Sequence, residues 1–249
     1  MSLRLSSFTR QACKSGLLAA LLVGLGGAAP CAAANESCQA YPTINVKITP
    51  VIDEAQINKN LDLAGIQALS ASPQTHQIPH YDSVTLGLAV YDPFLKFNIP
   101  LRQQHMPDGA YCSQVQKVDA EIGYHTITIY IANEFPEGSC AYQTILTHER
   151  KHVAVNNAIL KEYIPKIQQR LQSYLKINGR FVVPNKAYAE KTLRERLTAI
   201  IQEVSKEMLE ENKRRQRLID SPQEYAKNNT ACGGVIARTA LHFKRSHRR

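Results

Sequence analysis

The chain of 249 residues has no tryptophan, only three methionines and no run of about 18 apolar residues, the length that a membrane-spanning helix needs. It also lacks a self-similar repeat of roughly 20 to 50 residues, which argues against a solenoid. No Cys-x-x-Cys pair is present, so neither a zinc ribbon nor a dithiol redox motif is expected. With 44% hydrophobic and 20% charged residues, the composition is that of a globular protein.

Acidic residues are missing from both ends of the chain, and this explains the formal net charge of +9. Residues 1–34 hold three bases and residues 233–249 hold five, which leaves 22 of the 30 bases against 21 acids in residues 35–232. A neutral body argues against a nucleic-acid partner. We expect residues 233–249 to be a flexible basic tail, which either solubilises the protein or makes weak contact with an anionic surface.

The N-terminal segment has the features of a secretory signal peptide. Arg4, Arg10 and Lys14 precede an apolar run over residues 16–27, and small residues follow up to Ala34. A run of this length is too short to cross a bilayer, which favours a cleaved signal peptide over residues 1–34. The sequence therefore predicts an exported protein, periplasmic or extracellular, without a transmembrane segment.

Four cysteines remain after removal of the signal peptide, and an even number in an oxidising compartment predicts two disulfides. Three pairings are open. We favour Cys112–Cys140 together with Cys38–Cys232, which would tie the two ends of the mature chain together.

The order of local patterns predicts an α+β fold in a single domain over residues 35–232. Residues 43–49, 83–91 and 122–131 are typical of strands, and residues 53–70 have room for one short helix. From Ser139, a fair N-cap, the apolar spacing is helical, and Pro165 predicts a kink or a break. A second helix is expected from about Lys186 to Leu218. We therefore expect an N-terminal antiparallel sheet followed by long antiparallel helices.

The first of these long helices contains His148, Glu149 and His152 in the pattern His-Glu-x-x-His. A spacing of four residues places both imidazoles on one helical face, where they can share one zinc ion. The glutamate can accept a proton from water that zinc activates. The motif predicts one Zn²⁺ per chain and a catalytic role for Glu149.

A catalytic zinc ion usually has three protein ligands, and the longer pattern His-Glu-x-x-His-x-x-Gly-x-x-His is absent. If the two long helices pack antiparallel, residues 148–152 face residues 209–213. Glu211 is then a candidate third ligand, with Glu207 behind it. The alternative is that these acids pair at the surface with nearby bases.

Two further acids follow the second helix. Asp220 is a candidate ligand or a turn residue, and Glu224 is a weaker candidate because Ser221 to Glu224 reads as a capping box. Tyr225 is a candidate donor to an oxyanion, or a core residue. If no acid of this region binds the metal, His125 on the preceding strand is the next candidate.

Residues 136–142, 145–153 and 220–225, together with Gln216, resemble a bacterial family of predicted secreted zinc-dependent proteases built on a domain of unknown function. Several relatives carry an Asp-x-x-Thr-x-His-Gly ending. Here Asp220 matches, whereas Gln223 stands in place of the threonine and Tyr225 in place of the histidine. The resemblance implies a zinc-binding role for Asp220.

These observations predict a zincin-like fold and an exported, monomeric zinc metallopeptidase that acts on a peptide or protein. In that architecture an edge strand before the motif helix pairs with an extended substrate, and we expect residues 122–131 to be this strand. The alternative is a non-catalytic exported binding protein that attaches to an anionic surface through its basic tail.

Overall fold

The computed structural model describes residues 38, 43–72 and 84–247. The predicted signal peptide, residues 1–34, lies outside these residues. None of the helices among the described residues combines the length and the apolar character that crossing a membrane requires.

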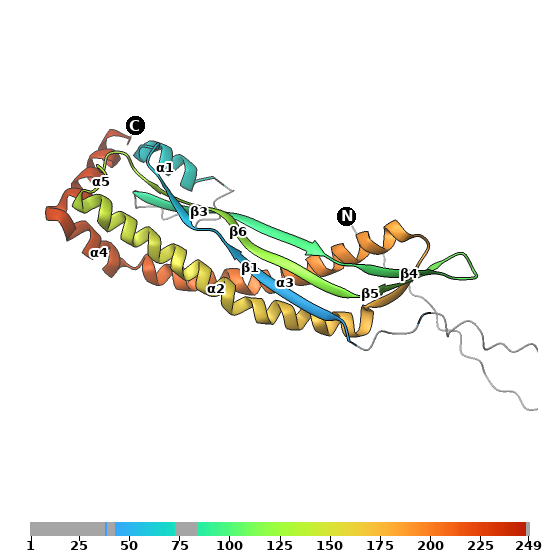
Figure 1. Ribbon diagram of the computed structural model, residues 1–249. Helices are drawn as coiled ribbons and strands as arrows, with labels where there is room; N and C mark the ends of the chain where they lie inside the picture. Colours follow the sequence, from blue (N-terminus) through green and yellow to red (C-terminus); the bar gives the residue numbers. More distant parts are fainter. Residues whose placement is uncertain (1–37, 39–42, 73–83, 248–249) are drawn as a thin grey trace, which may run out of the picture. The chain divides into compact units, whose positions relative to one another are not determined.

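Strand β6 (Lys117–Ile131) is the centre of the main sheet (Figure 1). On one edge it pairs in parallel with β1 (Asn45–Ile52) and then β2 (Ala55–Asn58), and on the other it pairs antiparallel with β3 (Gly87–Asn98). The predicted antiparallel sheet is therefore wrong, because this sheet is mixed. Alternation of apolar residues fixes the two faces of a strand but not the direction of its neighbours.

The position of β6 also corrects the expected edge strand. Residues 122–131 have neighbours on both sides, so their backbone is not free to pair with a substrate. Strands β1, β2 and β3 each pair only with β6 among the described strands, and β3 is the one that contacts Glu149 of α2.

A second, antiparallel sheet consists of β4 (Leu101–His105), β5 (Tyr111–Val115) and β7 (Arg180–Val183). Strand β7 lies in the connection between the two long helices. Sequence reasoning did not identify this sheet.

The HExxH motif lies on helix α2 (Cys140–Asn178), which follows the short helix α1 (Leu63–Ser70). Helix α2 begins where predicted, because the Ser139 side chain accepts a hydrogen bond from the backbone N–H of Tyr142. It continues through Pro165 as one helix, so the break considered for this position does not occur.

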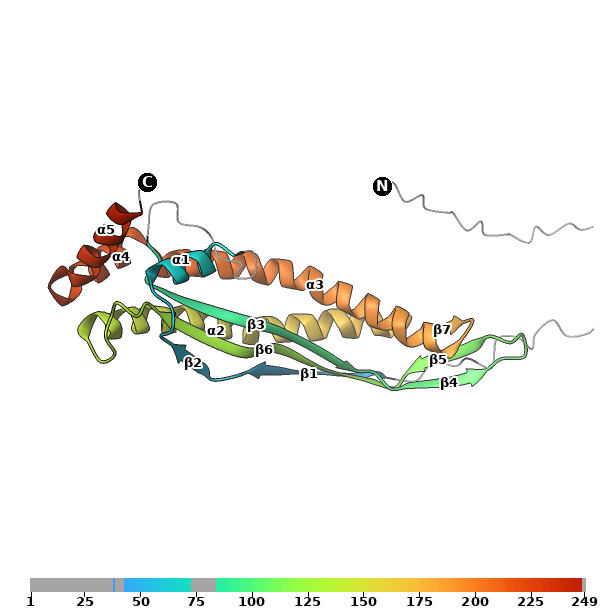
Figure 2. The same ribbon diagram turned by 90° about the horizontal axis from the view of Figure 1, so that it is seen from above.

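Helix α3 (Lys186–Ile219) packs antiparallel on α2 (Figure 2). The contacts show the direction: His152 meets Gln216, Asn156 meets Asn212, and Tyr163 meets the carbonyl of Glu207. His152 thus faces residue 216 instead of residue 209, a displacement of seven residues or about two helical turns. Helix α2 runs beyond Leu175 before the chain turns, which shifts the register in this direction.

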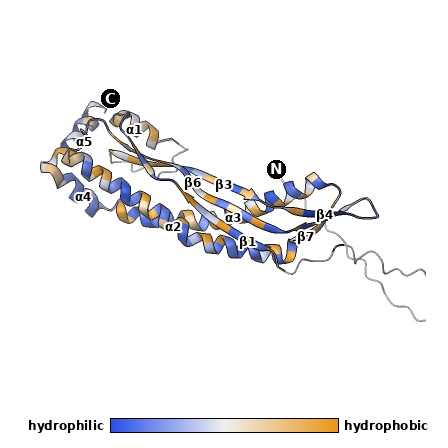
Figure 3. Ribbon diagram, viewed as in Figure 1, coloured by the Kyte–Doolittle hydropathy of each residue, from blue (hydrophilic) through white to orange (hydrophobic). Residues whose placement is uncertain are grey.

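Apolar side chains of α2 pack on the sheet and on α3. One cluster joins β1 and β6 to the second half of α2 and to Leu193, Leu197, Ile201 and Val204 of α3. A second cluster joins α1, β3 and the end of β6 to the first turns of α2. Hydrophilic and hydrophobic residues alternate along both long helices in Figure 3, as expected for helices with one buried face.

The chain ends in helix α4 (Pro222–Thr230), a 3-10 turn (Ala231–Gly234) and helix α5 (Val235–Ser246). The expectation of a flexible tail over residues 233–249 is wrong for α5, which is helical. Ile236 is buried and Phe243 packs against the second cluster, so apolar contacts hold α5 in place.

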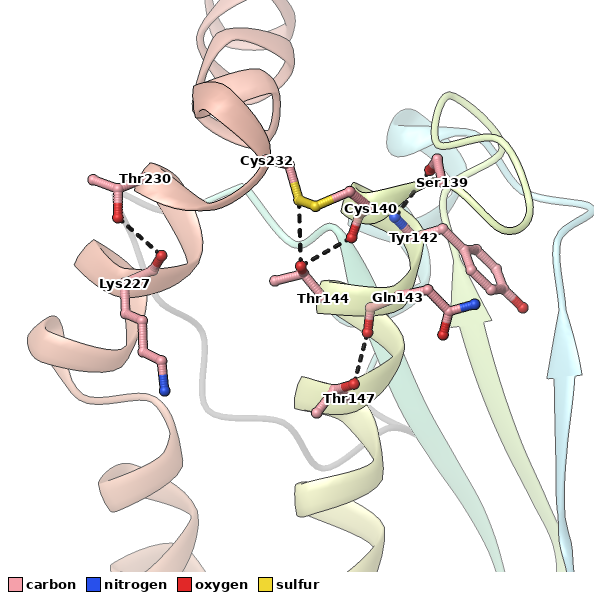
Figure 4. Close-up of a disulfide and its surroundings, with 9 residues drawn as sticks. All are labelled: Ser139, Cys140, Tyr142, Gln143, Thr144, Thr147, Lys227, Thr230 and Cys232. Atoms are coloured by element: carbon pink, nitrogen blue, oxygen red, sulfur yellow. Dashed lines mark hydrogen bonds between the residues drawn. A yellow bond between two sulfur atoms is a disulfide. The ribbon is translucent and has the colours of Figure 1, made fainter.

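The four cysteines form two disulfides, as predicted, but the favoured pairing of Cys112 with Cys140 and Cys38 with Cys232 is wrong. Cys38 is bonded to Cys112, and Cys140 to Cys232. The second bond joins the first residue of α2 to the 3-10 turn after α4 (Figure 4). The Thr144 hydroxyl lies 3.5 Å from the Cys232 sulfur and donates to the carbonyl of Cys140.

Candidate metal centre

Two series of residues spaced by four face each other across the α2–α3 contact. Helix α2 contributes His148, His152 and Asn156, whereas α3 and its C-terminal cap contribute Asp220, Gln216 and Asn212. A spacing of four keeps each series on one helical face. Because the helices are antiparallel, the two series meet member by member.

At one end of this contact, His148, His152 and Asp220 bring three donor atoms together. The two Nε2 atoms are 3.1 Å apart, and each lies 3.2 Å from Oδ1 of Asp220. A tetrahedral zinc ion with bonds of about 2.0–2.1 Å holds its ligand atoms about 3.3–3.4 Å apart. The donor set and its spacing therefore fit zinc, and the third candidate ligand is Asp220.

Neighbouring side chains orient each member of this triad. Oε1 of Gln216 contacts Nδ1 of His152, and the amide nitrogen of Asn228 lies 3.4 Å from Nδ1 of His148. The Tyr225 hydroxyl donates to Oδ1 of Asp220 at 3.3 Å. Such outer partners fix the orientation of metal-binding side chains.

In the metal-free protein, His152 and Asp220 form a largely buried ion pair. Burial disfavours the charged form of His152, but a hydrogen bond and the charges of Asp220 and Glu149 outweigh it and raise the pKa of His152 to about 9. Burial of Asp220 is likewise outweighed by hydrogen bonds to both histidines, so its pKa lies well below the usual range. A cation and a proton therefore compete for the same atoms.

Glu149 lies on the adjacent face of α2, turned towards the sheet. Its side chain is 6% exposed, and the backbone N–H of Ala89 on β3 donates to its carboxylate. Burial raises the pKa of Glu149, although the two histidines partly offset this. A raised pKa makes the carboxylate a stronger base, which suits a group that takes up a proton.

Glycine at position 87 makes room for this carboxylate. A Cβ atom on Gly87 would lie 2.9 Å from both Cγ and Oε1 of Glu149 and 2.7 Å from Cγ2 of Ile145. The carbonyl of Leu86 accepts from Ala132 beside β6, so the backbone groups of Gly87 and Ala89 turn to the opposite edge. The edge of β3 that faces away from β6 therefore runs beside Glu149.

The structure removes the other acids from consideration. Glu211 pairs with Arg214 and Arg215, whose hydrogen bonds lower its pKa to about 2. Glu224 forms an ion pair with Lys151, with 2.7 Å between Oε2 and Nζ. Glu211 was therefore the wrong candidate, because the two-turn shift in register moves it past the histidines.

Glu207 and His125 are also not part of the triad. His125 stacks against Phe94 and lies 3.7 Å from Asp53, with about half of its side chain exposed. Tyr225 does lie beside the triad through its contact with Asp220, and its role as an oxyanion donor stays a prediction.

The sequence analysis assigned no role to the side-chain amides around the triad. Asn156 follows His152 by four residues, and Asn212 and Gln216 precede Asp220 by eight and four. Continuation of the four-residue spacing was a usable signal, because it keeps polar side chains on a helix face that is otherwise buried. Gly87 and Asn228 gave no such signal.

Comparison with known proteins finds no matching family model, no similar curated protein and no similar solved structure.

Proposed function

We propose that this protein is an exported zinc-dependent peptidase of zincin-like architecture. The observation that carries the proposal is the convergence of His148, His152 and Asp220 beside the buried carboxylate of Glu149. Two histidines and one carboxylate are a ligand set typical of hydrolytic zinc sites, which keep one position open.

In this proposal the three side chains hold the metal, and Glu149 handles the proton. When bound, zinc supplies Lewis acidity that activates water and polarises a carbonyl group. Glu149 accepts a proton at its carboxylate and later returns it to the departing amine, a dual role that its raised pKa favours. Tyr225 and Asn228 keep Asp220 and His148 in place.

A peptide substrate suits the strand that borders the site. The N–H of Ala89 on the outward edge of β3 already donates to Glu149, and the outward backbone groups beyond it would pair with an extended chain. We infer that β3, in place of the strand expected from the sequence, aligns the substrate. The two disulfides favour an oxidising compartment and hence export.

The test measures zinc content and peptide turnover separately. We expect Asp220→Ala to weaken zinc binding by orders of magnitude, whereas Glu211→Ala, a nearby acid with surface partners, leaves the affinity unchanged. Glu149→Gln should keep zinc and lose turnover of casein or a peptide library, and the exposed Glu203→Gln serves as its control.

Full turnover by Glu149→Gln would refute the assigned mechanism. Zinc binding without turnover in the wild type would instead support the alternative, a non-catalytic exported binding protein.

A further inference from the structure

Polar contacts continue from the triad into the α2–α3 interface as a chain of side-chain amides. Gln216 contacts His152, its amide nitrogen donates to Oδ1 of Asn212 at 3.1 Å, and Asn212 donates to Oδ1 of Asn156 at 2.9 Å. Asn156 in turn donates to the hydroxyl of Tyr124 on β6. The chain therefore links the sheet to one of the candidate metal ligands.

Burial makes this chain costly unless every contact is made. Asn156 is 6% exposed and lies on the same helix as the apolar residues Val153 and Ile159. A buried amide without partners destabilises a fold by about 1–3 kcal/mol, whereas an apolar residue of similar size would pack there without that penalty. Fold stability alone does not explain three amides in series.

Each amide has one accepting end and one donating end, so the orientation of one determines the next. Asn212 uses its nitrogen towards Asn156 and presents Oδ1 to Gln216. The nitrogen of Gln216 meets this oxygen and also the backbone carbonyl of His152 at 3.3 Å, which leaves Oε1 to face Nδ1 of the imidazole. An oxygen acceptor at that position requires a proton on Nδ1 of His152.

A neutral imidazole with its proton on Nδ1 has a lone pair on Nε2, the atom that faces the triad. The opposite tautomer would place a proton at the position where a metal binds. Among the described residues, the amide contact of His148 is with Asn228 at 3.4 Å, and no comparable chain continues from it.

We propose that Gln216, Asn212 and Asn156 form an amide relay that fixes the tautomer of His152 and thereby prepares Nε2 to bind the metal. The three are positioning residues. The metal-binding part of this inference rests on the proposed function, whereas the contact of Gln216 with Nδ1 of His152 is a property of the metal-free protein.

The decisive pair of variants is Gln216→Met and Gln216→Glu. Methionine keeps the volume but removes the acceptor, so zinc affinity should fall about 10- to 100-fold in chelator competition. Glutamate keeps an oxygen acceptor for Nδ1 and should retain most of the affinity. Gln202→Met, on an exposed face of the same helix, is the matched control and should leave the affinity unchanged.

A second variant and a second readout keep the relay testable if Gln216→Met does not fold. Asn212→Leu leaves Gln216 in place but frees its orientation, and we expect about a tenfold loss of affinity. In metal-free protein, NMR should show slow exchange of the His152 Nδ1–H in the wild type, because Gln216 accepts this hydrogen bond, and faster exchange in both variants.

Wild-type affinity and an equally slow exchange of the His152 Nδ1–H in the folded variants would overturn the relay. If the wild type binds no zinc, the proposed function fails, and the NMR measurement alone then judges the relay.

Discussion

The Cys140–Cys232 disulfide offers the sharpest test of how the candidate metal centre is held together. Helix α4 has no buried residue, yet it follows Asp220 directly and carries Tyr225 and Asn228, both of which contact the triad. Apart from polar contacts, the segment is fixed at its far end by Ile236 and by the disulfide. Removing the bond should loosen one side of the site.

The two disulfides allow a matched comparison because they close loops of similar size. Their sequence separations are 92 for Cys140–Cys232 and 74 for Cys38–Cys112. The chain-entropy relation gives a stabilisation of about 4.6 kcal/mol for the first and about 4.5 kcal/mol for the second. Replacement of either pair by alanine should therefore lower the free energy of unfolding by similar amounts.

Zinc affinity should separate the two variants. Cys140→Ala with Cys232→Ala frees the segment that carries Asp220 and its partners, and we expect an affinity loss of about tenfold or more. Cys38→Ala with Cys112→Ala should keep wild-type affinity. Cys112 is buried and Cys140 is exposed, so the control variant loses at least as much packing.

The assay combines urea unfolding of the metal-free proteins with chelator competition under conditions where both variants are folded. Equal affinity losses would show that the disulfides act only through global stability. No loss in either variant would show that the contacts of α4 suffice, and both results would refute the local role assigned to Cys140–Cys232.

Two further predictions follow from the site. Gly87→Ala places a methyl group 2.9 Å from the Glu149 carboxylate, so it should cost about 1–3 kcal/mol and reduce peptide turnover while zinc content stays the same; unchanged turnover would contradict the placement of Glu149. In metal-free protein, the raised pKa of His152 should contribute about 3 kcal/mol of stability that is present below pH 6.5 and lost as pH rises to about 9. Urea titrations across this range test it, and an identical slope in His152→Gln would exclude this origin.

Local signals in the sequence predicted the two long helices well. Ser139 and Asn185 each accept a hydrogen bond from a backbone N–H of the first helical turn, so both long helices begin where their N-caps stand. The i, i+4 histidines lie on one face of α2 for the same reason, since helical periodicity depends only on nearby residues. These features needed no knowledge of the tertiary structure.

Non-local features could not be obtained in this way. The order of the main sheet depends on the pairing of β1, β2 and β3 with β6. The residue pattern of each strand is compatible with parallel or antiparallel pairing. The disulfide pairing depends on which chain segments meet, and four cysteines leave three choices. Identifying the third candidate ligand required the register between α2 and α3. This register differs by seven residues from the expected one, which had placed Glu211 opposite the histidines.

The residues of the candidate centre come from both sides of the connection between β7 and α3. Pro184 and Asn185 are exposed there, His148 and Glu149 precede them, and Asp220 follows. A single cut after Pro184 would give a two-chain molecule in which Cys140–Cys232 still joins the halves. We expect the site to form in this two-chain molecule, whereas neither fragment alone carries all of its residues.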